Sequence, residues 1–221
     1  MMEYKEILNE IEKQLEGEAH LDELAKKKQD PFKILISTIL SARTRDENTR
    51  VATDKLFAKY NTPKSIAEAY IGELEQLIKT SGFYKVKAAR IKEVSKILCE
   101  EYNCKVPNNY EELLNLPGVG SKTANCVLVY AFKIPAIPVD THVHRISNRL
   151  GWVKTKNPIK TEDALKKTIP KELWLKLNRL FVRFGQQICI PIKPKCDICT
   201  INDICPKDFS MEMIPKKKKT L

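Results

Sequence analysis

Lys122 is the residue whose setting suggests chemistry most directly. It follows the segment 116–120, Leu-Pro-Gly-Val-Gly, whose two glycines let the backbone turn tightly, and it lies in the first turn of a helix expected to begin near Ser121. The N–H groups and positive dipole end of such a helix form a phosphate-binding device. The dipole and the basic surroundings also favour the neutral amine, which is a nucleophile. The alternative is an ordinary turn followed by a lysine that only contacts phosphate.

Asp140 is the second candidate for chemistry. It lies in the segment 139–145, Val-Asp-Thr-His-Val-His-Arg, after a proline-containing connection over residues 133–140. An aspartate at the start of the following helix is expected to act as its N-cap, a role that is compatible with catalysis. We expect His142 and His144 to pack or hydrogen-bond, because no carboxylate or cysteine partner for a metal lies close to them in sequence.

Four cysteines give the most specific pattern, with the spacing Cys-x6-Cys-x2-Cys-x5-Cys. They are Cys189, Cys196, Cys199 and Cys205. Interleaved prolines make this segment a compact loop that can wrap one metal centre. Structural zinc normally uses two short Cys-x-x-Cys pairs across a longer gap, whereas one pair with wider arms suits a 4Fe-4S cluster. Zinc remains the alternative from spacing alone.

The composition predicts a soluble globular protein. Of its 221 residues, 43% are apolar and 30% are charged. The first twenty residues are rich in glutamate, which argues against a signal peptide, and the apolar runs are too short to span a bilayer. We therefore expect no membrane partner and a cytoplasmic location, or a nuclear one in a eukaryote. A reducing compartment and seven cysteines argue against disulfides, so three cysteines should be small buried residues: Cys99, Cys104 and Cys126.

The charge distribution indicates a phosphate-backbone partner. The net charge is +11, and residues 149–221 hold seventeen Lys or Arg against seven Asp or Glu. Such a basic region is typical of nucleic-acid binding, although it does not distinguish DNA from RNA or anionic lipid. The run Lys216 to Lys219 is expected to be a solvated tail. An amphipathic helix in the first twenty residues has an acidic face, which we expect to lie against the basic C-terminal region.

The pattern of elements predicts an all-α fold. Helix starts are indicated by capping patterns that begin at Asp30, Thr44, Ser65 and Asn108. Apolar stripes at helical spacing recur between them, and no long period-two pattern indicates a strand. Helix ends are expected at Gly82, Gly151 and Gly185.

Together, the hairpin with its lysine, the aspartate eighteen residues later and the cysteine loop resemble the endonuclease III family of helix-hairpin-helix DNA glycosylases. The resemblance covers nearly the whole chain and rests on LPGVGSKTAN at 116–125, VDTH at 139–142 and the cysteine spacing. It implies two helical lobes with a DNA-binding cleft between them. A six-helix barrel with the helix-hairpin-helix motif would span 22–134, and an iron-sulfur lobe would combine 1–21 with 135–221. The cluster loop, 189–205, would hold one 4Fe-4S cluster, and the protein would be a monomer.

The resemblance also implies a mechanism. Lys122 attacks the sugar C1′ of an extruded nucleotide in double-stranded DNA, expels an oxidised pyrimidine and forms a Schiff base, from which β-elimination cuts the strand on the 3′ side. Asp140 stabilises the developing positive sugar or accepts the lysine proton. An abasic site is the second substrate.

Further DNA contacts are carried over from the family by position. They are the hairpin residues Pro117, Gly118, Val119 and Gly120, together with Arg43, Phe83, Lys193 and Lys195. Phe83 would be an apolar wedge that fills the space left by the extruded base, with core packing as the alternative. Arg43 stands where many relatives have glutamine, so the contact of that glutamine with the unpaired base is not carried over.

Two other functions compete with this interpretation. A one-step glycosylase of the same superfamily would remove a base without cutting the strand, but such relatives generally lack the lysine at position 122. A noncatalytic DNA-binding module would use the hairpin to grip phosphate and zinc in place of the iron cluster.

Overall fold

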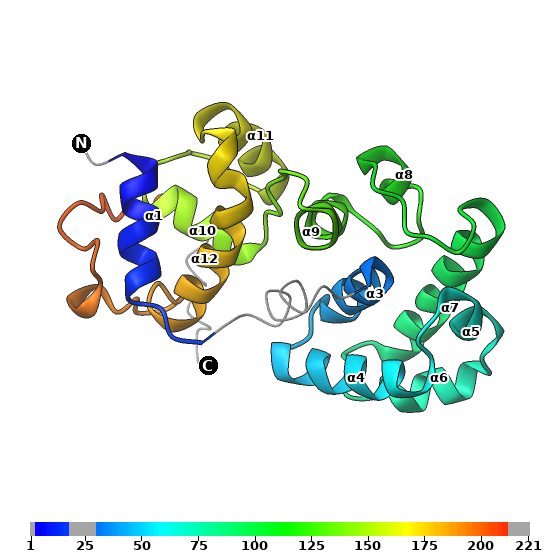
Figure 1. The fold of residues 1–221 in the computed structure, drawn as a ribbon. Coiled ribbons are helices and arrows are strands. Elements are labelled where there is room, and N and C mark those ends of the chain that lie inside the picture. The colour runs from blue at the N-terminus through cyan, green and yellow to red at the C-terminus, as the bar shows by residue number, and fades with distance from the viewer. Residues whose placement is uncertain (1–2, 18–29, 212–221) are drawn as a thin grey trace, which may run out of the picture. The chain divides into compact units, whose positions relative to one another are not determined.

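The computed structural model describes residues 3–17 and 30–211 of the chain. Every regular element in these ranges is a helix (Figure 1), so the predicted all-α fold is confirmed. No helix within them has both the length and the apolar content that a membrane span requires. The lysine run at 216–219 lies outside the described residues. The monomeric state and the cellular location stay predictions.

The chain divides into two compact units. Residues 17–138 form the hairpin unit, and residues 1–16 with 139–221 form the cysteine-loop unit. From the sequence we placed the first boundaries at 22–134. The connection after residue 134 belongs to the hairpin unit because Ala136 and Ile137 are buried, and because Asn125 donates a hydrogen bond of 3.4 Å to the carbonyl of Ile137.

The hairpin unit is built around α3 (Pro31–Ser41). This helix begins as predicted, with Pro31 in its first turn and the Asp30 carboxylate accepting the Phe32 N–H at 2.9 Å. Eight of its eleven residues are buried because it packs against neighbours on several sides. The other helices of the unit are α4 (Asp46–Lys59), α5 (Pro63–Glu68), α6 (Ile71–Leu77), α7 (Tyr84–Glu101), α8 (Tyr110–Leu114) and α9 (Ser121–Phe132).

The cysteine-loop unit is organised by α12 (Trp174–Gln187), which packs against both α1 (Tyr4–Lys13) and α10 (Thr141–Arg149). α11 (Pro158–Thr168) contacts α10, and two short 3-10 turns lie at Lys171–Leu173 and Cys196–Ile198. The predicted amphipathic character of α1 is confirmed, since its apolar face is buried through Ile7, Leu8 and Ile11.

The acidic face of α1 lies against basic residues of α12, as the sequence predicted. The Glu12 carboxylate accepts from Lys176 at 2.5 Å and from Arg179 at 2.6 Å. The hydrogen bond from Lys176 is the main reason that the pKa of Glu12 is held below its ordinary value. Because these groups are partly exposed, their contribution to stability is small, and their main effect is to orient α1 on α12.

Three of the four predicted helix starts are displaced. Asn109, not Asn108, caps α8, and Ser65 is the third residue of α5, where it forms a capping box with Thr62. α4 is preceded by Arg45 at its N-cap, so the prediction that Thr44 caps this helix is wrong. The Thr44 side chain is instead bonded to the segment that precedes α7, as described below.

The expectation that Cys99 and Cys104 are free buried residues is wrong, because they form a disulfide at the end of α7. Asn103 and Cys104 both adopt left-handed backbone angles, with φ of 51° and 56°, which turn the chain back after the helix. The odd number of cysteines argues against a framework that pairs all of them. It does not exclude a single disulfide between two cysteines that are close in sequence. Cys126 is buried and is not part of a disulfide, as expected.

The sequence predicted a helix end at Gly185, and this prediction is wrong, because Gly185 lies inside α12. A Cβ at this position would be 2.4 Å from Nδ1 of His142 and 2.9 Å from Nη2 of Arg145. Glycine is required here because α12 approaches the side chains of α10 too closely for any larger residue.

We predict that Gly185→Ala lowers the free energy of unfolding by about 1 to 3 kcal/mol, because His142 and Arg145 must move away from the new methyl group. Thermal unfolding followed by circular dichroism measures the change. Lys96→Ala is the control, since this side chain of α7 is 67% exposed and its loss should leave the free energy of unfolding nearly unchanged. Equal melting temperatures for the two variants would contradict the close approach of α12 to α10.

Candidate active site and cysteine loop

The predicted hairpin joins α8 to α9 and forms a helix-hairpin-helix motif. Leu116 and Val119 are buried and anchor the hairpin, whereas Gly118 and Gly120 are exposed. Gly118 has a φ of 73°, a left-handed angle that favours glycine. Gly120 is the N-cap of α9. The exposed backbone of the two glycines is therefore the part of the hairpin that suits a phosphate, and any contact from Val119 must come from its backbone.

Lys122 is the second residue of α9, directly behind this hairpin. Its side chain is half-buried. Every residue of the next two turns of α9, from Ala124 to Tyr130, is buried, and α9 packs against α3. The backbone that carries the lysine is therefore fixed by the core of the hairpin unit.

Asp140 caps α10, as predicted. Its Oδ1 atom accepts the Val143 N–H at 2.8 Å, and the residue is half-exposed. Asp140 opens α10 of the cysteine-loop unit, whereas Lys122 belongs to the hairpin unit. The rigid start of α10 fixes the direction of the Asp140 carboxylate.

The two histidines of α10 take part in hydrogen bonds within the cysteine-loop unit. Nδ1 of His144 lies 2.6 Å from the hydroxyl of Thr161, and burial lowers the pKa of this imidazole. Nδ1 of His142 lies 3.1 Å from Nη2 of Arg145. These contacts are those of structural histidines, which is the role that the sequence predicted.

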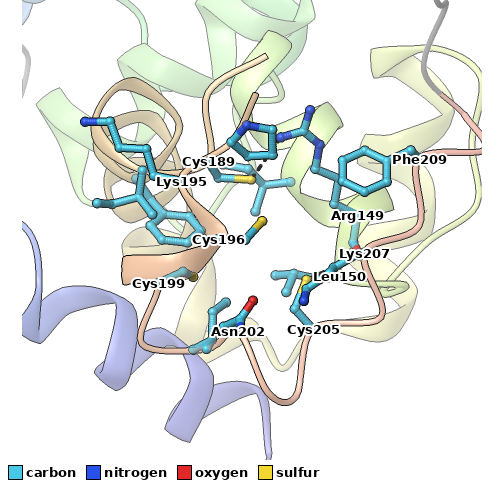
Figure 2. Close-up of a pocket in the computed structure, with 15 residues that line it drawn as sticks. Arg149, Leu150, Cys189, Lys195, Cys196, Cys199, Asn202, Cys205, Lys207 and Phe209 are labelled. Atoms are coloured by element: carbon cyan, nitrogen blue, oxygen red, sulfur yellow. Dashed lines mark hydrogen bonds between the residues drawn. The ribbon is translucent and has the colours of Figure 1, made fainter. Parts of the chain in front are cut away.

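The four clustered cysteines line a single pocket of the cysteine-loop unit (Figure 2). All four are free and half-buried, and apolar side chains of α10 and α12 complete the pocket wall. Burial raises the pKa of Cys199 and of Cys205, and negative charge on neighbouring cysteines raises both further. Four thiolates here consequently need a compensating cationic group. Among the described residues, no three potential ligands are grouped around the position of one metal ion.

Two arginines of α10 hold the start of this loop, and the sequence analysis did not identify them. Arg149 is 2% exposed and donates to Sγ of Cys189 at 3.3 Å and to the carbonyls of Ile190 and Pro191 at 2.8 Å each. Arg145 donates to the carbonyl of Cys189 at 2.8 Å. A spacing of four residues, about one helical turn, places both arginines on one face of the helix. This spacing is the feature of the sequence from which their shared role could have been predicted.

Lys193 and Lys195 are exposed on the segment between the first two cysteines. Lys193 has a left-handed φ of 55°, and the Lys195 N–H donates to the carbonyl of Ile188 at 3.0 Å. The folded loop therefore presents both cations to solvent, as a phosphate contact requires.

Arg43 and Phe83 lie together in the hairpin unit although forty residues separate them in sequence. Cζ of Arg43 lies 5.9 Å from the centre of the Phe83 ring. Phe83 is 63% exposed, so the alternative that it packs in the core is wrong. Both residues have left-handed backbone angles, with φ of 52° and 59°. The exposed aromatic ring is suited to insertion between bases.

Comparison with known proteins defines the family. A model described as the HhH-GPD superfamily base excision DNA repair protein matches residues 36–171. Endonuclease III of Thermotoga maritima is 57% identical over 179 residues, which cover 81% of this chain and 84% of that protein. The chain belongs to the endonuclease III family. Endonuclease III of Haemophilus influenzae is 41% identical over 175 residues, with 79% of this chain and 83% of that protein covered.

Solved structures of endonuclease III share this fold. A non-covalent endonuclease III–DNA complex has a TM-score of 0.81 and 37% identity, covering 94% of this chain and 97% of that one. A trapped covalent endonuclease III–DNA intermediate has a TM-score of 0.79 and 34% identity with the same coverage. The chain is therefore a DNA-binding enzyme of base excision repair, in a family of DNA glycosylases with abasic-site lyase activity. The noncatalytic alternative is thereby excluded.

Proposed function

We propose that this enzyme removes oxidised or ring-saturated pyrimidines from double-stranded DNA and then cuts the strand through a Schiff base on Lys122. The observation that carries the proposal is the place of Lys122 in the first turn of α9, directly behind the exposed hairpin glycines. A backbone that grips phosphate and an amine that attacks the neighbouring sugar are then parts of one rigid element.

Lys122 performs the covalent step. Its neutral amine forms a bond to C1′ as the glycosidic bond breaks, and the base leaves with the bonding electron pair and takes up a proton. Opening of the sugar ring, with a proton going to O4′, gives the Schiff base. Loss of a proton from C2′ then breaks the C3′–O bond, so that the phosphate leaves and the strand is cut on the 3′ side. Water releases Lys122 from the remaining imine.

Asp140 supplies negative charge to this reaction. A carboxylate at the half-exposed start of α10 stabilises the cationic sugar as the base departs, or accepts the proton that Lys122 must lose before it attacks. The cap bond from Val143 engages Oδ1 of Asp140 and orients the group without removing its charge. Capping and catalysis therefore use the same side chain together.

Duplex DNA is held and opened by residues away from the reacting atoms. The hairpin from Pro117 to Gly120 binds phosphate through its backbone, and Lys193 and Lys195 add two exposed cations. Phe83 enters the space that the extruded base leaves, with Arg43 beside it.

The cysteine loop fits one 4Fe-4S cluster held by Cys189, Cys196, Cys199 and Cys205. Four half-buried thiols line one pocket with apolar walls. Arg149 donates a hydrogen bond to the sulfur of Cys189, and hydrogen bonds to cysteine sulfurs are a feature of iron-sulfur sites. When bound, the cluster supplies the positive charge that four thiolates need and thereby orders the loop. The chemistry at the sugar is performed by the side chains of Lys122 and Asp140.

Replacing Lys122 with alanine tests the nucleophile. Borohydride added to the wild-type enzyme on DNA with an oxidised pyrimidine should trap a covalent complex, and Lys122→Ala should trap none. Base release should fall by about a thousandfold or more, the scale on which removal of a nucleophile acts. Lys96→Ala, an exposed lysine of α7, is the matched control and should trap normally. Trapping that persists in Lys122→Ala would exclude this residue as the nucleophile.

Asparagine at position 140 separates capping from catalysis. Asn is as good an N-cap as Asp, so Asp140→Asn should change the free energy of unfolding by less than about 0.5 kcal/mol, whereas Asp140→Ala should lose about 1 kcal/mol. Both variants should lose most of the base-release rate, because each lacks the carboxylate charge. Normal activity of Asp140→Asn would reduce Asp140 to a structural cap.

Metal analysis of the purified enzyme tests the cluster. We expect brown protein with about four irons and four sulfides per chain, and visible absorbance that a chelator and oxidant remove. Colourless protein with one zinc per chain would show that the four cysteines bind zinc and not an iron-sulfur cluster. The proposal for Lys122 would be unaffected.

A further inference from the structure

The hairpin unit contains a buried lysine that the chemistry above does not use. Lys87 lies one turn into α7 and is only 3% exposed. Buried lysines are rare, because an ammonium group that leaves water needs strong compensating contacts. Its position therefore needs an explanation.

The ammonium group of Lys87 is surrounded by four oxygens from two separate segments of the chain, the end of α3 with the residues that follow it and the segment before α7. It donates to the carbonyls of Leu40 at 2.7 Å and Ala42 at 2.6 Å, and it contacts the hydroxyls of Thr44 at 2.8 Å and Ser81 at 2.9 Å. The two carbonyls belong to the end of α3, where helical carbonyls lack partners and a cation is favourable. All four oxygens are uncharged, and burial lowers the pKa of Lys87 to about 8.

Two of these contacts lie on either side of Arg43, since Ala42 precedes it and Thr44 follows it. The Ser81 contact lies two residues before Phe83, and the backbone N–H of Lys87 donates to the Phe83 carbonyl at 3.1 Å. One side chain thus joins the segments that carry the two DNA-facing residues.

Further bonds join the same two segments. The Gly82 N–H donates to the Thr44 hydroxyl at 3.1 Å, and the Ser81 hydroxyl donates to the Leu40 carbonyl at 3.0 Å. A Cβ on Gly82 would lie 3.0 Å from the carbonyl oxygen of Arg43, so the two backbones are close. Lys87 is the centre of this group of contacts.

We propose that Lys87 is the positioning residue that holds Arg43 and Phe83 together as one preformed wedge for opening the DNA duplex. This inference rests on the proposed function, because the wedge matters only if a damaged or abasic nucleotide is extruded from the duplex. Both wedge residues have left-handed backbone angles, which non-glycine residues keep only where the surroundings hold them. A wedge that is ordered before DNA arrives loses less conformational entropy on binding than two independent loops.

Single-stranded DNA separates this role from general stability. An abasic site in a single strand can be attacked by Lys122 without extrusion of a nucleotide from a duplex, and it leaves no gap opposite a second strand. The same site in a duplex needs the wedge. A positioning role for Lys87 consequently affects cleavage of the duplex and spares cleavage of the single strand, whereas general damage to the hairpin unit affects both.

Lys87→Met is the main test, because methionine keeps the length and flexibility of the side chain and lacks the ammonium. We expect cleavage of an abasic site in duplex DNA to slow by about tenfold or more, and cleavage in single-stranded DNA by less than about twofold. Lys96→Met is the matched control on the same helix, where the side chain is 67% exposed, and should leave both rates unchanged. Equal losses on the two substrates, or no loss on the duplex, would overturn the proposal.

A double variant tests whether Lys87 acts through the wedge. Phe83→Ala should show the same selective loss on duplex DNA, and adding Lys87→Met to it should cause little further loss, because residues that act as a unit are not additive. Independent, multiplied losses would contradict the proposal. If Lys87→Met fails to fold by circular dichroism, Thr44→Val decides the question, since it removes one oxygen around the ammonium and should give a smaller loss on duplex DNA alone.

Failure of the wedge proposal can be distinguished from failure of the proposed Schiff-base mechanism. A wild-type enzyme that gives no borohydride-trapped complex on either DNA would refute the Schiff-base mechanism. A wild-type enzyme that is trapped on both DNAs, together with equal losses on both in Lys87→Met, would refute the wedge and leave the Schiff-base mechanism standing.

Discussion

Buried cations that bind backbone carbonyls fix the functional loops in both units. Lys87 binds the carbonyls at the end of α3, and Arg149 binds those that follow α12. The carbonyls at the end of α3 lack intrahelical partners and carry the negative end of the helix dipole, so Lys87 satisfies both needs, whereas the Arg149 acceptors Ile190 and Pro191 lie in the loop beyond α12. Each cation orders the loop that leaves that helix. One of these loops carries Arg43, and the other carries the four cysteines.

This device explains why the loops need little apolar packing of their own. Arg43 and Phe83 are exposed, and the cysteine loop presents exposed lysines. An exposed side chain has few packing contacts of its own, so its position must be set by the buried groups that hold its backbone. A buried cation is effective for this purpose because several hydrogen bonds converge on one group, and the loss of that group leaves several buried oxygens unsatisfied. The surface thereby remains available while its geometry is fixed.

Much of the fold and of the candidate site followed from the sequence. The helical periodicity of apolar residues predicted the all-α class. The short polar side chain of Asp140 directly before a helix predicted its role as an N-cap. Two of the errors share a cause, because they concern residues whose partners are distant in sequence. Thr44 matches a capping box, yet its hydroxyl binds the segment before α7. Gly185 matches the pattern of a helix end, yet position 185 has glycine because side chains of α10 leave no room for a Cβ there. Lys87 carried no local signal, since a lysine is expected at the surface.

The contacts that hold the wedge avoid the side chains of the wedge itself. Lys87 binds carbonyl and hydroxyl groups beside residues 43 and 83, and the close approach of Gly82 involves the backbone of Arg43. The geometry of the loop therefore does not depend on which side chain stands at position 43. This accounts for an arginine where the family resemblance leads us to expect glutamine, because the backbone is held in the same way with either residue. Arginine adds a planar, permanently charged group whose Cζ lies 5.9 Å from the centre of the Phe83 ring, so the proposed wedge presents a cation and an aromatic ring together.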